Sequence, residues 1–217
     1  MSASDRVRQI QVVASSRLHF GLVSFGHVGR RQFGGIGVML QKPSLELLFS
    51  SSSALEVTGE LSDRVLTFVE DWAQWHGQSE LPSCRIEVLS VPRQHVGLGV
   101  GTQLGLSVAS GLNCFLGQPE PPLEELVQSV RRGARSAIGS YGFSSGGLIV
   151  DAGKTEADQM SSLEARLPLP DAWRWVLICP PQGSGLSGKR EGKAFEQVEP
   201  VSEAISERLT NEIHQEI

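Results

Sequence analysis

Glycines alternate with apolar residues immediately before a predicted helix. Residues 94–111 read QHVGLGVGTQLGLSVASG, and the small or polar positions are Gly97, Gly99, Gly101, Thr102 and Gln103. Glycine costs roughly 0.5–1 kcal/mol relative to alanine in folding entropy, so this stretch must need bare backbone. Free amides at a helix N-terminus attract anions, and glycines let the backbone curl around phosphate oxygens. The stretch therefore predicts a phosphate site, although a flexible connector with a helix cap would have a similar sequence.

Two other glycine-dependent motifs fit the chain less well. A dinucleotide-binding loop would need a third glycine where Thr102 stands, and no acidic strand end follows at the required spacing. The GKT triplet at 153–155 suggests a Walker loop, but Leu148 stands where the first glycine is needed. The hydroxyl of Thr102 remains able to reach a phosphate or a bound magnesium ion.

Composition limits the classes of partner. The 217 residues carry a net charge of −5, with 20% charged residues, so we expect binding neither to nucleic acid nor to a membrane. No apolar run reaches about 18 residues, and the three cysteines are too scattered for a disulfide framework or a zinc site. We therefore expect a soluble protein of the reducing cytoplasm.

The elements that must position the loop follow from hydrophobic periodicity. Strands are predicted over 8–22, 34–43 (ended by Pro43), 44–50, 54–59, 84–92, 146–153 and 173–181. Helices are predicted over 62–77 (capped by Ser62 or Asp63), 102–116, 122–134, 191–197 and 202–213. This order predicts an α+β protein with a mostly antiparallel sheet. A polar, proline-flanked stretch predicts a domain boundary near Pro170, which gives domains of residues 1–170 and 171–217.

Four blocks resemble a known family when they are taken in order. They are SRLHFGLVSFGHVGRRQFGGIG (16–37), PRQHVGLGVGTQLGLSVA (92–109), RGARSAIGSYGFSSGGLIVDAG (132–153) and PPQGSGLSGKREGKAF (180–195). The second block resembles the phosphate loop of the GHMP kinase superfamily, except that Val100 and Gly101 replace the two serines usual in the kinases. Together the blocks resemble the β-ribofuranosylaminobenzene 5'-phosphate synthases, the β-RFAP synthases, of tetrahydromethanopterin biosynthesis.

The resemblance implies both a fold and an activity. The fold would be GHMP-kinase-like, with a ribosomal-protein-S5-like N-terminal domain and a shortened C-terminal domain. The activity would be a transferase that does not use ATP. It would join phosphoribosyl pyrophosphate to 4-aminobenzoate through a carbon–carbon bond and release pyrophosphate and carbon dioxide, usually with magnesium. The substrates are thus a phosphorylated sugar and an aromatic acid.

Such a reaction must hold pyrophosphate charge and keep water from a ribosyl cation-like centre. Arg17 and His19 share one face of a predicted strand, and Lys189 lies in a loop able to close over phosphates, so these three are the candidate catalytic residues. The candidate substrate- and phosphate-binding residues are Arg30, Arg31, His95, Gly97, Gly99, Gly101, Thr102, Gln103, Arg135, Ser136 and Arg190. Asp151 and Glu191 are the candidate magnesium ligands. A turn or a solvated helix end would also account for these two carboxylates.

Two alternative functions stay open. One is an ATP-dependent GHMP small-molecule kinase, which the missing serine pair disfavours. The other is a truncated, non-catalytic paralogue, which the chain end at Ile217 and the absence of an acidic residue near Ser24 favour. Because the segment after Pro170 is too short for a good core, we expect a homodimer that buries Trp173 and Trp175, or packing of this segment onto the first domain.

Overall fold

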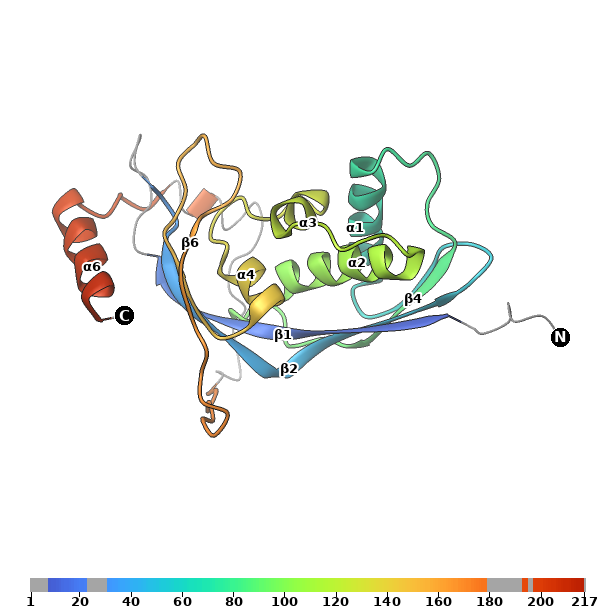
Figure 1. The fold of residues 1–217 in the computed structure, drawn as a ribbon, viewed down its shortest axis with the longest axis horizontal. Helices are drawn as coiled ribbons and strands as arrows, with labels where there is room; N and C mark the ends of the chain where they lie inside the picture. Colours follow the sequence, from blue (N-terminus) through green and yellow to red (C-terminus); the bar gives the residue numbers. More distant parts are fainter. Residues whose placement is uncertain (1–7, 23–30, 179–192, 195–196, 217) are drawn as a thin grey trace. The chain divides into compact units, whose positions relative to one another are not determined.

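The computed structural model describes residues 8–22, 31–178, 193–194 and 197–216 (Figure 1). In chain order its elements are β1 (Gln9–Leu22), β2 (Gly35–Ser51), β3 (Glu56–Gly59), α1 (Ser62–Trp75), β4 (Cys84–Ser90), α2 (Val100–Leu116), α3 (Leu123–Ser129), α4 (Ile138–Ser145), β5 (Leu148–Asp151), β6 (Leu163–Leu167) and α6 (Glu203–Glu216). The protein is α+β, as predicted. The chain forms two compact units, and β1 and β2 each contribute to both.

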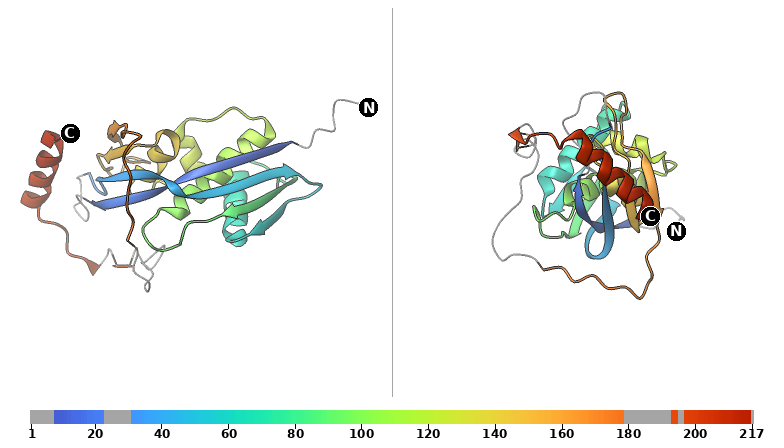
Figure 2. Two further views of the ribbon diagram at one scale, coloured as in Figure 1. Left: turned by 90° about the horizontal axis from the view of Figure 1, so that it is seen from below. Right: turned by 90° about the vertical axis from the view of Figure 1, so that its left-hand side faces the viewer.

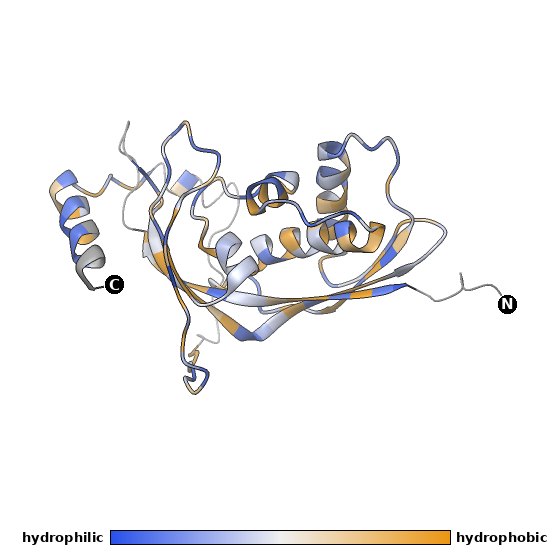
Figure 3. Ribbon diagram, in the orientation of Figure 1, coloured by the Kyte–Doolittle hydropathy of each residue, from blue (hydrophilic) through white to orange (hydrophobic). Residues whose placement is uncertain are grey.

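The first unit comprises the described residues of Met1–Ser16, Leu40–Arg93 and Gly99–Arg132. In its sheet β2 pairs antiparallel with β4, which pairs parallel with β3. Helix α2 is buried along most of its length and is coloured mainly apolar in Figure 3. It lies so close to the sheet that a Cβ on Gly111 would stand 2.2 Å from the Phe49 ring. Trp72 of α1 donates a buried hydrogen bond of 2.9 Å from Nε1 to Asn113 Oδ1 of α2.

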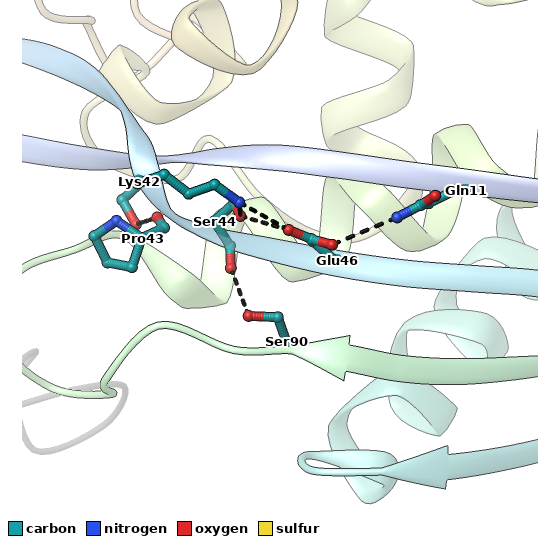
Figure 4. A network of polar contacts seen from close by, with 7 residues as sticks. Gln11, Lys42, Pro43, Ser44, Glu46 and Ser90 are labelled. Atoms are coloured by element: carbon teal, nitrogen blue, oxygen red, sulfur yellow. Dashed lines mark hydrogen bonds and ion pairs between the residues drawn. The ribbon is translucent and has the colours of Figure 1, made fainter.

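Strand β2 does not end at Pro43, so that prediction was wrong. It continues through a cis Lys42–Pro43 peptide bond (Figure 4). Hydroxyls from neighbouring segments satisfy the backbone there: Ser16 Oγ donates to the Pro43 carbonyl at 2.6 Å, and Ser90 Oγ to the Ser44 carbonyl at 3.2 Å. Proline lacks a donor but keeps its acceptor, so side-chain donors keep this part of the strand satisfied.

The second unit comprises the described residues of Arg17–Met39, Gln94–Leu98 and Gly133–Ile217. Here the first part of β2 pairs antiparallel with β5, and β5 pairs antiparallel with β6. Helix α4 approaches β2 closely, because a Cβ on Gly142 would lie 2.2 Å from Met39 Sδ. Figure 2 gives two further views of these elements. Neither α4 nor β6 was predicted, since the first reads as a glycine-rich run and the second lies in a polar stretch.

Three further expectations need correction. Helix α1 begins after Leu61, which adopts a left-handed conformation, and no Ser62 or Asp63 side-chain cap is present. Helix α3 ends at Ser129 instead of residue 134, because Arg131 and Gly133 take positive φ values of 50° and 79°.

The third correction concerns the predicted strand over 173–181, because residues 173–178 form no strand and the rest lies outside the described part of the chain. Within the second unit, Trp173 is 58% exposed, and Trp175, 42% exposed, contacts the Phe20 ring at a centroid distance of 6.2 Å. The domain boundary near Pro170 and the homodimer stay predictions. Among the described residues no helix has both the length and the apolarity to cross a membrane.

The contact between Gly111 and Phe49 gives a stability prediction. Gly111→Ala would force the Phe49 ring or α2 to move, and overpacking of this kind costs roughly 1–3 kcal/mol. Gly105→Ala on the same helix is the matched control, because its Cβ would meet the Phe68 ring at 3.1 Å and needs only a small shift. Urea unfolding should show a clear loss for Gly111→Ala and a smaller effect for Gly105→Ala. Equal stability of both variants and the wild type would contradict the packing described.

Candidate functional site

Strand β1 meets the glycine loop through its backbone. The amide of Arg17 donates to the carbonyl of Leu98 at 3.0 Å, and Leu98 lies between the two loop glycines of positive φ, Gly97 and Gly99. The sequence places Arg17 and Leu98 in separate blocks, 81 positions apart. This hydrogen bond therefore brings the first and second blocks together at the residues predicted to do chemistry.

The ring of His19 packs closely against the backbone of Gly35. A Cβ on Gly35 would stand 3.3 Å from Cε1 and Nε2 of the His19 ring and 2.3 Å from the carbonyl oxygen of Gly21. A Cβ on Gly37 would stand 2.7 Å from the carbonyl oxygen of Leu18. The glycines of the first block therefore let β1 approach β2 more closely than side chains would permit.

The imidazole of His19 is neutral at physiological pH. Burial, and then the positive charge of Arg17, lower the pKa of His19 from 6.5 to about 4. Its Nε2 atom is buried and has no hydrogen-bond partner among the described residues. A neutral imidazole can accept or donate one hydrogen bond at this atom, depending on its tautomer.

The carboxylate of Asp151 accepts hydrogen bonds from several residues of the third block. Its carboxylate is 3% exposed and accepts hydrogen bonds from the Ala137 amide at 2.6 Å, Ser136 Oγ at 2.9 Å and the Gly153 amide at 2.8 Å. Burial raises the pKa of Asp151, although these hydrogen bonds act in the opposite direction. The carboxylate thus holds the start of α4 to the end of β5.

Among the described residues, no three His, Cys, Asp or Glu side chains come together in a way that could hold a metal ion. The oxygens of Asp151 already accept three hydrogen bonds, and Glu191 lies outside the described part of the chain. The roles of both residues as magnesium ligands stay predictions.

In the first unit, the loop leads into α2. Gly99 is the N-cap residue with φ 69° and ψ 17°, and its carbonyl accepts from the amides of Thr102 at 3.1 Å and Gln103 at 3.2 Å. These two amides are used by the first helical turn, and the Gln103 side chain is only 1% exposed. Among described residues, the amides of Gly99, Val100 and Gly101 make no backbone hydrogen bond, as expected at a helix start. The amides available to an anion are therefore those of the three residues before Thr102, and the amides of Thr102 and Gln103 are not among them.

Two arginines stand at this helix start and were missed by the sequence analysis. A Cβ on Gly101 would lie 2.7 Å from Nη2 of Arg64 and 3.4 Å from Nη2 of Arg132. Arg132 also lies over the Phe68 ring, with Cζ 4.9 Å from its centroid. Arg132 is the first residue of the third block, which was a usable signal. Nothing in the sequence pointed to Arg64, because it belongs to an ordinary amphipathic helix.

The remaining predicted residues are spread over several places. Arg31 donates from Nη1 to the Gly153 carbonyl at 2.9 Å and to Ser162 Oγ at 3.2 Å. These hydrogen bonds stabilise the turn after β5. The carbonyl of Arg135 accepts from Ser161 Oγ at 3.2 Å, and His95 is exposed with φ 58°. The predicted residues outside the described part of the chain are Arg30, Lys189, Arg190 and Glu191.

Comparison with solved structures gives the fold. The phosphomevalonate kinase of Streptococcus pneumoniae matches with a TM-score of 0.53 and 11% identity, over 72% of this chain and 57% of that one. The homoserine kinase of Cytophaga hutchinsonii also matches with a TM-score of 0.53, at 19% identity, over 78% of this chain and 54% of that one. No protein-family model matches the chain. The fold is that of the GHMP kinases, as expected.

Curated relatives show a similarity in sequence to one kind of synthase. The β-ribofuranosylphenol 5'-phosphate synthase of Archaeoglobus fulgidus is 32% identical over 201 residues, which cover 86% of this chain and 62% of that protein. The enzyme of the same name from Methanothermobacter thermautotrophicus is 28% identical over 227 residues, covering 94% of this chain and 68% of that protein. The chain is thus similar, over most of its length, to the β-ribofuranosylphenol 5'-phosphate synthases. It spans less than two thirds of the length of the Archaeoglobus relative.

The depressed pKa of His19 gives a pH prediction. The unfolded chain binds a proton at His19 more tightly than the folded chain does. The contribution of His19 to the free energy of unfolding is therefore highest above about pH 6.5 and falls as the pH decreases toward 4. His19→Gln should remove up to roughly 3 kcal/mol of this pH dependence. Urea unfolding between pH 7.5 and 4.5 measures it, with exposed His95→Gln as the control. Parallel pH profiles for the wild type and His19→Gln would refute the burial of this ring.

Proposed function

We propose that this chain catalyses phosphoribosyl transfer to an aromatic acid. The C1–O bond to pyrophosphate breaks, and the ring carbon that bears the carboxylate supplies the electron pair for a new bond to C1. Loss of that carboxylate as carbon dioxide returns an electron pair to the ring and restores its aromaticity. The observation that carries the proposal is the 32% identity to a synthase of this name across 86% of the chain.

The geometry supplies suitable groups for the charged part of the reaction. The helix dipole and the amides of Gly99, Val100 and Gly101 favour an anion at the start of α2, which suits the pyrophosphate leaving group. In the second unit, Arg17 and the neutral imidazole of His19 come from the same strand. Arg17 would bind a carboxylate or phosphate through its planar fork, and His19 would hydrogen-bond to the substrate without adding charge.

The identity of the aromatic acid is a separate question. The family resemblance implies 4-aminobenzoate, whereas the names of the relatives specify a ribofuranosylphenol, which carries a hydroxyl on the ring. By the same decarboxylating chemistry, a phenol product would come from 4-hydroxybenzoate. Both acids therefore belong in the assay. Magnesium as the helper and the cytoplasm as the location are proposals that rest on the resemblance and on composition.

An ATP-dependent kinase is the second candidate, because the solved structures of similar fold are kinases. Against it stands the replacement of the kinase serine pair by Val100 and Gly101. The deciding experiment measures pyrophosphate released from phosphoribosyl pyrophosphate by the purified chain, with magnesium and with each aromatic acid in turn. We expect release that depends on one of the acids, with carbon dioxide in equal amount. ADP formed from ATP and a small alcohol, without acid-dependent pyrophosphate, would reverse the assignment.

The glycine loop gives a matched pair of variants. Gly99 and Gly117 cap the two ends of α2 with almost the same backbone angles, φ 69° and ψ 17° against φ 73° and ψ 22°. Valine is strained in this region at either position, so both substitutions should lower the Tm by a similar amount. Only Gly99→Val should weaken pyrophosphate binding, by about tenfold or more, because only the N-terminal end offers amides to an anion. Calorimetric titration measures this, and equal affinities of the two variants would exclude the loop as the phosphate site.

A further inference from the structure

Arg64 and Arg132 come from different elements of the first unit and end at the same point. Arg64 lies in α1, and Arg132 follows α3. Their Nη2 atoms approach the position of a Gly101 Cβ to 2.7 Å and 3.4 Å. Two guanidinium groups therefore occupy the space beside the first turn of α2, where any residue larger than glycine would place side-chain atoms.

Three sources of positive charge meet at this point. Both guanidinium groups stay protonated in proteins, and the N-terminus of a helix carries a partial positive charge. The first turn of α2 contains no acidic residue. Burial is the cause that lowers the pKa of Arg64, as expected for a cation partly removed from water. This concentration of positive charge favours an anion with several oxygens, and two planar forks suit a phosphate group well.

Gly101 lies beside both guanidinium groups, and it is also one of the two positions at which the loop differs from the kinase motif. The GHMP kinases usually carry a serine at this position, and its Cβ would collide with the Arg64 guanidinium. Glycine at position 101 therefore leaves room for the guanidinium group of Arg64. Phe68 adds rigidity, because the Arg132 guanidinium lies over its ring.

We infer that Arg64 and Arg132 bind the pyrophosphate group of the sugar substrate, in the place that the serine side chain occupies in the kinase motif. This inference rests on the proposed function for the identity of the anion. It makes the two arginines specificity-determining residues, because they would favour a highly charged pyrophosphate ester over substrates that the serine-containing loop accepts.

Titration calorimetry with inorganic pyrophosphate and with phosphoribosyl pyrophosphate tests the inference. Arg64→Gln and Arg132→Gln should each weaken binding about tenfold or more, since each removes a charge-assisted contact. Gly101→Ser should do the same with little loss of Tm, because the atom it displaces is the flexible end of a long side chain. Arg131→Gln is the matched control: Arg131 adjoins Arg132 in sequence but pairs with Asp71 at 2.9 Å and is largely exposed, so its loss should leave the affinity unchanged.

The outcomes separate the inference from the proposed function. If Gly99→Val loses binding while Arg64→Gln, Arg132→Gln and Gly101→Ser bind like the wild type, the arginine assignment is overturned and the transferase proposal stands. If the wild type binds neither ligand and releases no pyrophosphate with either aromatic acid, both are overturned. If an arginine variant fails to fold, Gly101→Ser decides, because it keeps both arginines, and unchanged affinity in that variant overturns the inference.

Discussion

Bare glycine backbone at a few points is the constraint on which this structure depends. At Gly35 it makes room for the His19 ring, and at Gly101 it makes room for the Arg64 guanidinium. In each case a methyl group would stand closer than ordinary van der Waals contact to the polar side chain. The entropic cost of these glycines is thus balanced by the close approach of polar groups that a side chain at these positions would displace.

The same constraint explains the electrostatics of the two units. In the second unit, close packing against Gly35 removes His19 from water, so its pKa falls and the ring stays neutral. In the first unit, the bare first turn of α2 lets two permanent cations approach a helix N-terminus. Under the proposed function, the neutral hydrogen bonding of the second unit would suit an aromatic acid, and the positive charge of the first unit would suit a pyrophosphate ester.

Sequence periodicity was sufficient for elements that bury one continuous face. The helix at α2, the strand at β4 and most of β1 were predicted within about two residues, because their apolar spacing is regular. It failed where tertiary contacts override local preference. Pro43 stays inside β2 because Ser16 supplies a hydroxyl to its carbonyl, and that contact is invisible in a linear pattern. Helix α4 forms from glycine-rich sequence because Asp151 accepts the amide of Ala137 just ahead of its first residue.

The candidate site was predicted in part for a related reason. The glycine loop and the pair Arg17 and His19 have local signatures in spacing and residue type, whereas Arg64 has none and becomes visible only when α1 is folded beside α2. The family resemblance can point to residues that hydrophobic periodicity does not reveal, because Arg132 is the first residue of one of the four blocks. A charged residue on an amphipathic helix gives no sign of the surface it will meet.

The most direct test of the account is a crystal structure of this chain with pyrophosphate bound. The account predicts pyrophosphate oxygens within about 2.7–3.2 Å of the amides of Gly99, Val100 or Gly101 and of the guanidinium nitrogens of Arg64 and Arg132. Pyrophosphate bound elsewhere, with both guanidinium groups still packed beside Gly101 and no anion on the first turn of α2, would contradict it.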